Sequence, residues 1–292
     1  MKSKKTGASE IPPSFSILFD LIRWEEKAIL DAARSKGVSV SLVDLKECVF
    51  DTLSSSVKER LVLQRCAGHY RNLHSTALLE SLGHRVVNSF HATYISSNKL
   101  FCTLALIKKG VPTPKTKLAF SVDSALEAIK QLGYPVVLKP VVGSWGRLSA
   151  LLSDEFSAKA LIEHREYMYP VYQVYYIQEY VKRPPRDIRS FVVGGKTVAA
   201  IYRYSAPSEW RTNTARGGKA EACSISDELN ELSIKAAEAV GGEIVGVDLM
   251  ETNDGLVVHE VNATTEFKNT VPATGVDIPS LIVDYMVELE KR

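Results

Sequence analysis

Two carboxylates and an amide near the end of the chain have the residue types and spacing of a metal site. They are Asp248, Glu260 and Asn262, in the stretch VDLMETNDGLVVHEVN. An Asn-Asp-Gly turn (253–255) between two apolar runs predicts a β-hairpin. The hairpin places Asp248 opposite Glu260, with Cβ atoms about 5 Å apart. Because side chains alternate along a strand, Asn262 is expected on the same face.

This register assumes that Thr252 pairs with Leu256 across the turn. Carboxylates that face each other among apolar residues repel unless a cation neutralises them, and an all-oxygen donor set suits Mg²⁺. The alternative is an ordinary hairpin whose acids face solvent. Strict alternation places His259 on the opposite face, so we expect it to be structural.

A lysine and a glycine-bounded turn follow one another in VVLKPVVGSWGRLSALL (136–152). Lys139 ends an apolar run and is carried on a rigid strand; an exposed edge lysine is the alternative. The turn 143–147 is neither a P-loop nor a dinucleotide fingerprint. Its small residues would let backbone N–H groups approach phosphate oxygens, and Arg147 would add charge. A plain hairpin turn fits the same residues.

Two further segments suggest polar ligands. In IQEYV (177–181), Gln178 and Glu179 stand among apolar residues, as in an adenine-and-ribose hinge or in a simple edge strand. The region 186–219 is rich in cations and could bind carboxylate or phosphate, although a charged loop is the alternative. Its basic residues are Arg186, Arg189, Arg203, Arg211, Arg216 and Lys219.

Composition narrows the class of protein. The 292 residues are 45% hydrophobic with a formal charge of +2, so a sizeable core is expected and neither nucleic acid nor a membrane surface is indicated. The four cysteines are far apart, which argues against a disulfide framework or zinc ribbon and favours a reducing cytoplasm. Residues 1–13 lack an apolar run, so we expect a flexible tail and no signal peptide. No stretch suits a bilayer span.

The first predicted domain is a small α/β domain, 14–97. Strands at 15–20 and 38–45 flank a helix at 23–36, which Gly37 ends. A second helix is expected near 70–82.

An α+β lobe with its linker helix is predicted for 98–181. Ser97 is expected to cap the linker helix, which Gly110 ends, and Ser121 opens the next helix. The last predicted lobe, 182–292, has a C-terminal helix, another near 227–240, and strands at 187–193, 196–204, 243–250 and 256–261.

With these residues in view, the chain resembles the ATP-grasp superfamily, and within it the RimK/LysX-like amine ligases. The resemblance covers 15–290 and rests on the blocks KPVVGSWGR, IQEYV, DIRSFVVGG, TNTARGGKAE, VDLMET and HEVNATTEFKNT. It implies an ATP-grasp fold, with ATP between two α+β lobes behind a small N-terminal α/β (pre-ATP-grasp) domain.

The resemblance also implies roles for individual residues. The nucleotide contacts become Lys99, Lys139, Gly143, Ser144, Trp145, Gly146, Arg147, Gln178, Glu179, Asp187, Arg203 and Asn213. The residues implied to bind the amino-acid substrate are Thr214, Ala215, Arg216, Gly217, Gly218, Asn262, Glu266, Phe267, Lys268, Asn269 and Thr270. Lys139, Arg203 and Arg216 become catalytic, and Asp248, Glu260 and Asn262 bind Mg²⁺.

The implied activity is a carboxylate–amine ligation through an acyl phosphate. The family's members include ligases that join α-aminoadipate to the carrier protein LysW in lysine biosynthesis, which is the expected function here. The alternatives are a glutamate–LysW ligase of arginine biosynthesis, dual specificity, a RimK-like ligase that adds glutamate to a protein tail, and an ATP-binding module without turnover. The complete metal triad and both lysines argue against the last. We expect a cytoplasmic homo-oligomer.

The choice of amino acid depends on the residues after Asn262. In the family these distinguish the relatives, and here they are Ala263 and Thr264. A small alanine leaves room for the extra methylene of α-aminoadipate. One methylene in a pocket contributes only about 1–3 kcal/mol, so dual specificity is physically easy.

Overall fold

The computed structural model describes residues 14–143, 145–206, 209–212 and 219–292. The chain divides into two compact units. The first contains the residues up to Val87 together with Pro279–Arg292, and the second is Asn88–Ile278. The domain bounds expected from the sequence stay predictions, and the unit division differs from them in grouping the end of the chain with the N-terminal residues. None of the helices in the described ranges has the length and apolar character needed to cross a bilayer.

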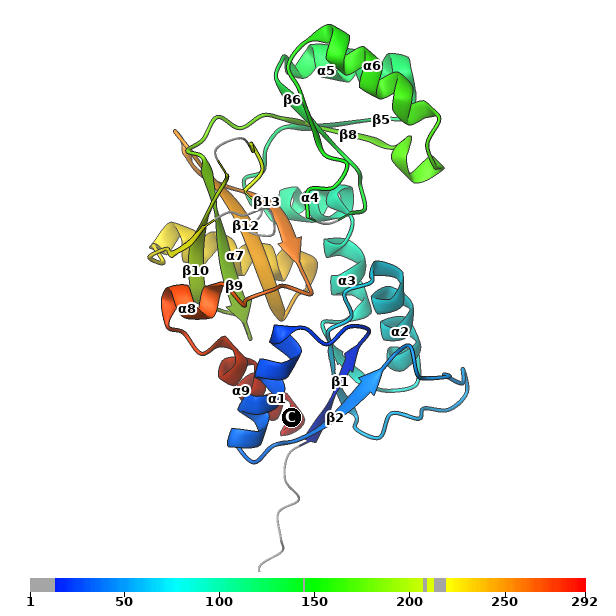
Figure 1. Ribbon diagram of the computed structural model, residues 1–292, viewed down its shortest axis with the longest axis vertical. Coiled ribbons are helices and arrows are strands. Elements are labelled where there is room, and N and C mark those ends of the chain that lie inside the picture. The colour runs from blue at the N-terminus through cyan, green and yellow to red at the C-terminus, as the bar shows by residue number, and fades with distance from the viewer. Residues whose placement is uncertain (1–13, 144, 207–208, 213–218) are drawn as a thin grey trace, which may run out of the picture. The chain divides into compact units, whose positions relative to one another are not determined.

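The first unit is built on a four-stranded parallel sheet in the order β2-β1-β3-β4 (Figure 1). The strands are β1 (Ser14–Phe19), β2 (Ser39–Asp44), β3 (Leu61–Gln64) and β4 (Arg85–Val87), with helices α1 (Trp24–Ser35) and α2 (His69–Ser81) in the connections. The strand-helix-strand unit is confirmed, and Gly37, with φ +68°, follows the end of α1 as expected. Strand β3 was not predicted.

The last helix, α9 (Ile278–Glu290), belongs to this unit from Pro279 onward. The Lys36 ammonium lies 2.8 Å from the Asp284 carboxylate, and the backbone N–H of Ser14 donates to the Glu290 carboxylate. Long-range contacts of this kind leave no local signal in the sequence.

The second unit contains a five-stranded antiparallel sheet in the order β11-β10-β9-β12-β13. The strands are β9 (Arg186–Val193), β10 (Lys196–Tyr204), β11 (Ala220–Ala222), β12 (Ile244–Thr252) and β13 (Gly255–Asn262). Helix α7 (Asp227–Val240) lies across one face (Figure 1). Alternating strand residues such as Val247, Leu249 and Val258 pack there with α7 residues in one core cluster. The opposite face is left for polar side chains.

A smaller antiparallel sheet, in the order β5-β8-β6-β7, forms the rest of this unit. The strands are β5 (Thr116–Ala119), β6 (Val136–Lys139), β7 (Ala150–Leu152) and β8 (Tyr175–Glu179). Helices α5 (Val122–Leu132) and α6 (Glu155–Glu166) cover one face and share its core (Figure 1). Ser121 caps α5 as predicted, because its hydroxyl accepts the N–H of Ser124.

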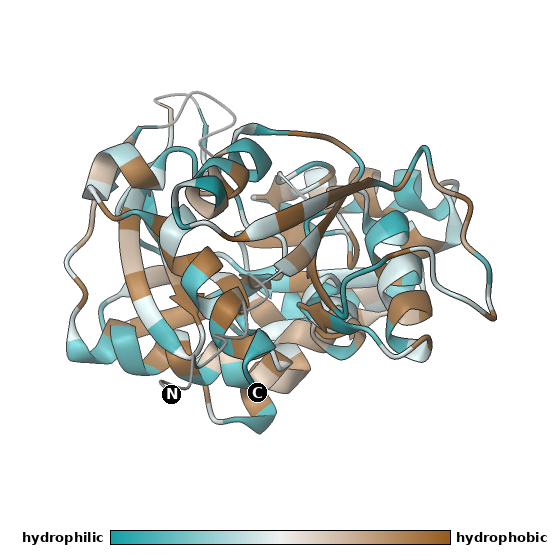
Figure 2. Cartoon of the chain, turned by 90° about the horizontal axis from the view of Figure 1, so that it is seen from below, coloured by the Kyte–Doolittle hydropathy of each residue, from teal (hydrophilic) through white to brown (hydrophobic). Residues whose placement is uncertain are grey.

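Short helices complete the described chain: α3 (Phe90–Ser96), α4 (Lys99–Lys108), the 3-10 turn η1 (Pro170–Tyr172) and α8 (Thr270–Thr274). The predicted cap of α4 is wrong by one residue. Asn98, and not Ser97, accepts the N–H groups of Leu100 and Phe101, because a side-chain amide oxygen satisfies free helix donors equally well. Figure 2 shows hydrophobic and hydrophilic residues interchanging along many helices, as expected of helices with one buried face.

The register of the β12–β13 hairpin corrects one prediction and confirms another. Thr252 pairs with Gly255 and not with Leu256, so the loop has two residues. The one-residue error is offset by a bulge between Leu249–Val258 and Asp248–Glu260, where His259 is the extra residue. Asp248 therefore lies opposite Glu260 as predicted, and Gly246 lies opposite Asn262.

The close approach at Gly246 generates a stability prediction. A Cβ built on this residue would lie 2.9 Å from the Cβ of Thr265, which is closer than packed carbons tolerate. Gly246→Ala should therefore destabilise the fold by about 1–3 kcal/mol, measured by denaturant unfolding. Combining it with Thr265→Ala should recover part of the loss in a double-mutant cycle. Additive effects of the two changes would contradict the packing explanation.

Candidate functional site

The candidate site is built on the polar face of the five-stranded sheet, around a buried carboxylate. Asp248 on β12 is 3% exposed. Its strand neighbours in register are Glu260 on β13 and Arg189 on β9. On the next strand, Arg203 lies opposite Asp187. Four strands thus bring charged side chains of both signs together on one face.

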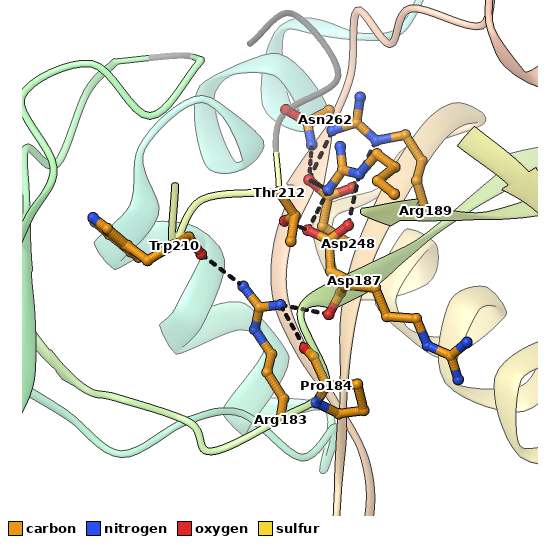
Figure 3. A network of polar contacts seen from close by, with 10 residues as sticks. Arg183, Pro184, Asp187, Arg189, Trp210, Thr212, Asp248 and Asn262 are labelled. Carbon is orange, nitrogen blue, oxygen red and sulfur yellow. Dashed lines mark hydrogen bonds and ion pairs between the residues drawn. The ribbon is translucent and has the colours of Figure 1, made fainter. Parts of the chain in front are cut away.

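Two arginines hold Asp248 (Figure 3). Arg189 donates from Nε and Nη2 to the two carboxylate oxygens, each at 2.7 Å, and the Nη2 of Arg203 lies 3.2 Å from Oδ2. Burial by itself would raise the pKa of Asp248, but the two guanidinium groups outweigh it and hold the pKa well below its usual range. The carboxylate is therefore ionised at any physiological pH.

Arg203 is itself fixed by a second acid. It donates to both oxygens of Asp187 at 2.8 and 2.7 Å, and the hydroxyl of Thr212 donates to the same carboxylate. Figure 3 shows Thr212, Arg189 and Asn262 directed toward this pair of aspartates. Burial opposes the charge of Arg203, but Asp187 and Asp248 raise its pKa further. Arg189, Asp248, Arg203 and Asp187 therefore form a chain of alternating positive and negative charges.

Lys99, the first residue of α4, connects two other predicted parts of the site. Its ammonium donates to the carbonyl of Gly143 at 2.8 Å and lies 3.4 Å from the carboxylate of Glu260. The structure therefore brings together a predicted nucleotide contact, the predicted phosphate-binding segment 143–149 (the flap) and a predicted metal ligand. All three roles stay predictions.

Lys139 stands at the end of β6, where its ammonium donates to the amide oxygen of Gln178 at 2.6 Å. Burial lowers the pKa of Lys139 to about 8, opposed by the negative charge of Glu260. An edge lysine in water would keep its ordinary pKa. Glu179 accepts the backbone N–H of Lys115 at 2.7 Å, which fixes the residue predicted as the hinge.

Arginine side chains hold the predicted flap by donating hydrogen bonds to its backbone carbonyls. Arg211 donates to the carbonyl of Gly146 at 2.9 Å, and Arg165 of α6 donates to that of Leu148. Trp145 has a positive φ of 57°, and the guanidinium of Arg147 lies 4.7 Å from its ring centre. Sequence reasoning missed Arg165 and assigned Arg211 only to a cationic region. Ser144 lies outside the described residues.

The predicted substrate residues fall into two groups. Asn213, Thr214, Ala215, Arg216, Gly217 and Gly218 lie outside the described residues. In the second group, Glu266, Lys268 and Asn269 are exposed, whereas Phe267 and Thr270 are buried. Because Phe267 and Thr270 are buried, they can contribute to packing of the fold. The substrate roles stay predictions for both groups.

Asp248, Glu260 and Asn262 fit Mg²⁺ by donor type, since two carboxylates and an amide oxygen share one face. Asn262 Nδ2 lies 3.4 Å from Asp248 Oδ2. Among the described residues, no three His, Cys, Asp or Glu side chains gather as a metal cluster. Because Arg189 donates to both oxygens of Asp248, its guanidinium competes with a cation for this carboxylate.

Two residues of this face were missed or misplaced by sequence reasoning. Arg189 was named only among many cations, although its i, i+2 spacing from Asp187 on a strand places both on one face. His259 was predicted on the opposite face, which is wrong. The core-facing residues on either side of it are Val258 and Val261, so the bulge turns both His259 and Glu260 away from the core.

Family models match nearly the whole chain. The LysX preATP-grasp domain matches residues 15–95, and the RimK-like ATP-grasp domain matches residues 96–286.

Relatives at substantial identity are ligases by name. The alpha-aminoadipate–LysW ligase LysX of Saccharolobus solfataricus is 39% identical, over 92% of this chain and 99% of its own. The glutamate–LysW ligase ArgX of Sulfurisphaera tokodaii is 33% identical, over 93% and 97%.

Solved structures share the fold at low identity. A RimK domain ATP-grasp protein from Sphaerobacter thermophilus superposes with a TM-score of 0.75 at 24% identity, covering 94% of this chain and 99% of that one. The ATP-grasp ligase PsnB, complexed with minimal precursor, Mg and ADP, superposes with a TM-score of 0.72 at 19% identity, over 95% and 98%.

The pKa of Lys139 predicts a proton linkage. A nucleotide phosphate beside the ammonium stabilises its charged form, so ADP affinity should fall as pH rises above about 8, and binding near pH 8.5 should take up protons. Calorimetry in two buffers of different ionisation enthalpy measures the uptake. Lys139→Met should abolish it. The exposed variant Lys159→Met is the matched control, and equal proton uptake by wild type and Lys139→Met would contradict the assignment.

The contacts of Asp248 predict competition between Arg189 and a divalent cation. Arg189→Met removes the guanidinium that contacts both carboxylate oxygens and leaves Arg203 near Oδ2, so Mn²⁺ should bind without nucleotide at least about tenfold more tightly than in wild type. Electron paramagnetic resonance of free Mn²⁺ measures the affinity. The gain should vanish in Arg189→Met/Asp248→Asn. Wild-type affinity in the single variant would show that Arg189 does not compete.

Proposed function

The chain belongs to the RimK-like ATP-grasp family, and from this membership we propose that it joins α-aminoadipate to the C-terminal glutamate side chain of the carrier protein LysW. The observation that carries the proposal is similarity to α-aminoadipate–LysW ligases over both matched regions. The arrangement of Asp248, Glu260 and Asn262 on one strand face supports an active nucleotide site.

The proposed reaction has two steps. A carboxylate oxygen of the carrier's glutamate attacks the γ-phosphorus of ATP, and ADP leaves with the electrons of the broken P–O bond. The amino group of α-aminoadipate then attacks the acyl phosphate carbon, phosphate leaves, and the nitrogen loses its proton to form the amide. This agrees with the ADP-forming carboxylate–amine ligation expected of the family.

The chain's own contribution is positioning and charge. Lys139 and Arg203 are proposed to offset the negative charge of the phosphates, and Lys99 orients the flap through the Gly143 carbonyl. Asp248, Glu260 and Asn262 would hold Mg²⁺, which neutralises phosphate oxygens when bound. Arg216 is proposed to act on the acidic substrate.

The cysteines support a mechanism without a protein nucleophile. All four are free thiols. Burial raises the pKa of the Cys102 thiol to about 12 and also raises that of Cys66. These two thiols remain protonated and weakly nucleophilic at neutral pH, which agrees with the proposed mechanism because it uses no protein nucleophile.

We propose that Ala263 and Thr264, which follow Asn262, favour α-aminoadipate as the amino-acid substrate. The structure holds the backbone here, because the Asn88 amide donates to the carbonyl of Ala263 at 2.7 Å. Because the backbone at Ala263 is held in place and its side chain is small, we propose that space remains for the longer side chain of α-aminoadipate. Glutamate ligation, as in the ArgX relative, is the second candidate, since that relative covers the chain equally well. Homo-oligomeric assembly and a cytoplasmic location stay predictions.

An ADP-release assay with purified LysW carrier tests the proposal. The expected kcat/KM for α-aminoadipate exceeds that for glutamate by about tenfold or more, the magnitude that one methylene provides. Glu260→Gln keeps shape but removes a charge, so it should nearly abolish turnover. Glu231→Gln, on the exposed face of α7, is the matched control. A preference for glutamate would favour the second candidate, and carrier-independent turnover would contradict both.

A further inference from the structure

His259 is the extra residue of the β13 bulge, and its environment is unusual for a structural side chain. Both ring nitrogens are buried, and neither has a hydrogen-bond partner in the described structure. A buried polar group without a partner costs free energy, and a hydrocarbon of similar shape would avoid this cost. An unpaired imidazole in this position therefore indicates a group that arrives from outside the chain.

The charges around the ring define what that group can be. The charged groups that act on His259 are three cations, Lys139, Arg203 and Arg183, and the carboxylate of Asp248. The protons of the cations are directed elsewhere: Lys139 donates to Gln178, and Arg203 to Asp187. Arg183 donates to backbone carbonyls, among them Pro184 and Trp210 (Figure 3). The ring thus lies near three cations and one carboxylate, and it hydrogen-bonds none of them.

The hydrogen-bonding capacity of the ring is unused, because both nitrogens are buried without a partner in the described structure. A neutral imidazole offers one N–H donor and one acceptor nitrogen. Such a ring can donate to an oxygen without adding charge to a site that is already rich in cations.

Resting on the proposed function, we propose that His259 is a nucleotide-contacting residue whose ring hydrogen-bonds an oxygen of the ribose–phosphate part of ADP or ATP. Three features carry the inference. The bulge turns the ring onto the face of Asp248 and Glu260, its nitrogens have no partner, and the proposed phosphate ligands Lys139 and Arg203 are near enough to act on it electrostatically. An anionic ligand with acceptor oxygens fits this surrounding charge.

Nuclear magnetic resonance of the imidazole nitrogens tests the contact directly. The chain has six histidines, so ¹⁵N-histidine labelling gives few resonances, and the loss of one pair in His259→Gln assigns the residue. ADP added without a divalent cation should shift the His259 nitrogens and leave those of the exposed His164 unchanged. Unmoved His259 resonances at saturating ADP would overturn the proposal.

Variants provide a second, independent measurement. His259→Phe fills similar space without nitrogens and should weaken ADP binding about tenfold. His259→Gln restores a donor and an acceptor and should recover part of the affinity, which a purely space-filling role would not produce. His164→Phe, on the exposed end of α6, is the matched control. Equal ADP affinity of wild type and His259→Phe would overturn the proposal.

The two proposals can fail separately. If the wild-type protein binds no ADP, the proposed function itself is wrong. If it binds ADP while the His259 resonances stay fixed, only the role of His259 is wrong. Because the resonance experiment uses the wild-type ring as its probe, it remains decisive even where His259→Phe fails to fold.

Discussion

The buried charge of Asp248 is the constraint on which the candidate site depends. A carboxylate at this depth is stable only if cations and hydrogen-bond donors replace water. Arg189 and Arg203 supply both, and Asp187 in turn balances Arg203. Because these residues come from three neighbouring strands, the register of the sheet decides whether the network can form at all.

That network also explains why the site suits an anionic ligand. Lys99, Lys139, Arg189 and Arg203 lie on or beside the same face, and each is engaged by an acid, an amide or a carbonyl of the chain. An incoming polyphosphate can replace the neutral partners of Lys99 and Lys139, which are the Gly143 carbonyl and the Gln178 amide, without leaving a buried charge unpaired. The flap is held in the same way, through carbonyls that bind cations. The protein therefore presents preorganised donors where negative charge would develop.

Much of this was predictable from local sequence. The Asn-Asp-Gly turn and two apolar runs predicted the hairpin, and Asp248 does lie opposite Glu260. The agreement depended on two compensating errors, because the loop is one residue shorter than assumed and the bulge at His259 restores the register. A bulge is decided by how both faces of a strand pack, and alternation along one strand carries no signal for it.

From the sequence alone, the ATP-grasp fold class followed from the resemblance to a known family. Local periodicity and turn residues determined most strands and helices, though not β3, and placed Asp248, Glu260 and Asn262 on one face of the β12–β13 hairpin. Tertiary structure alone decided which cations hold Asp248, how His259 is turned, and that the residues from Pro279 onward join the first unit. These features arise where segments distant in sequence meet. Their energies depend on burial and on partners brought from other strands, and no single segment contains either.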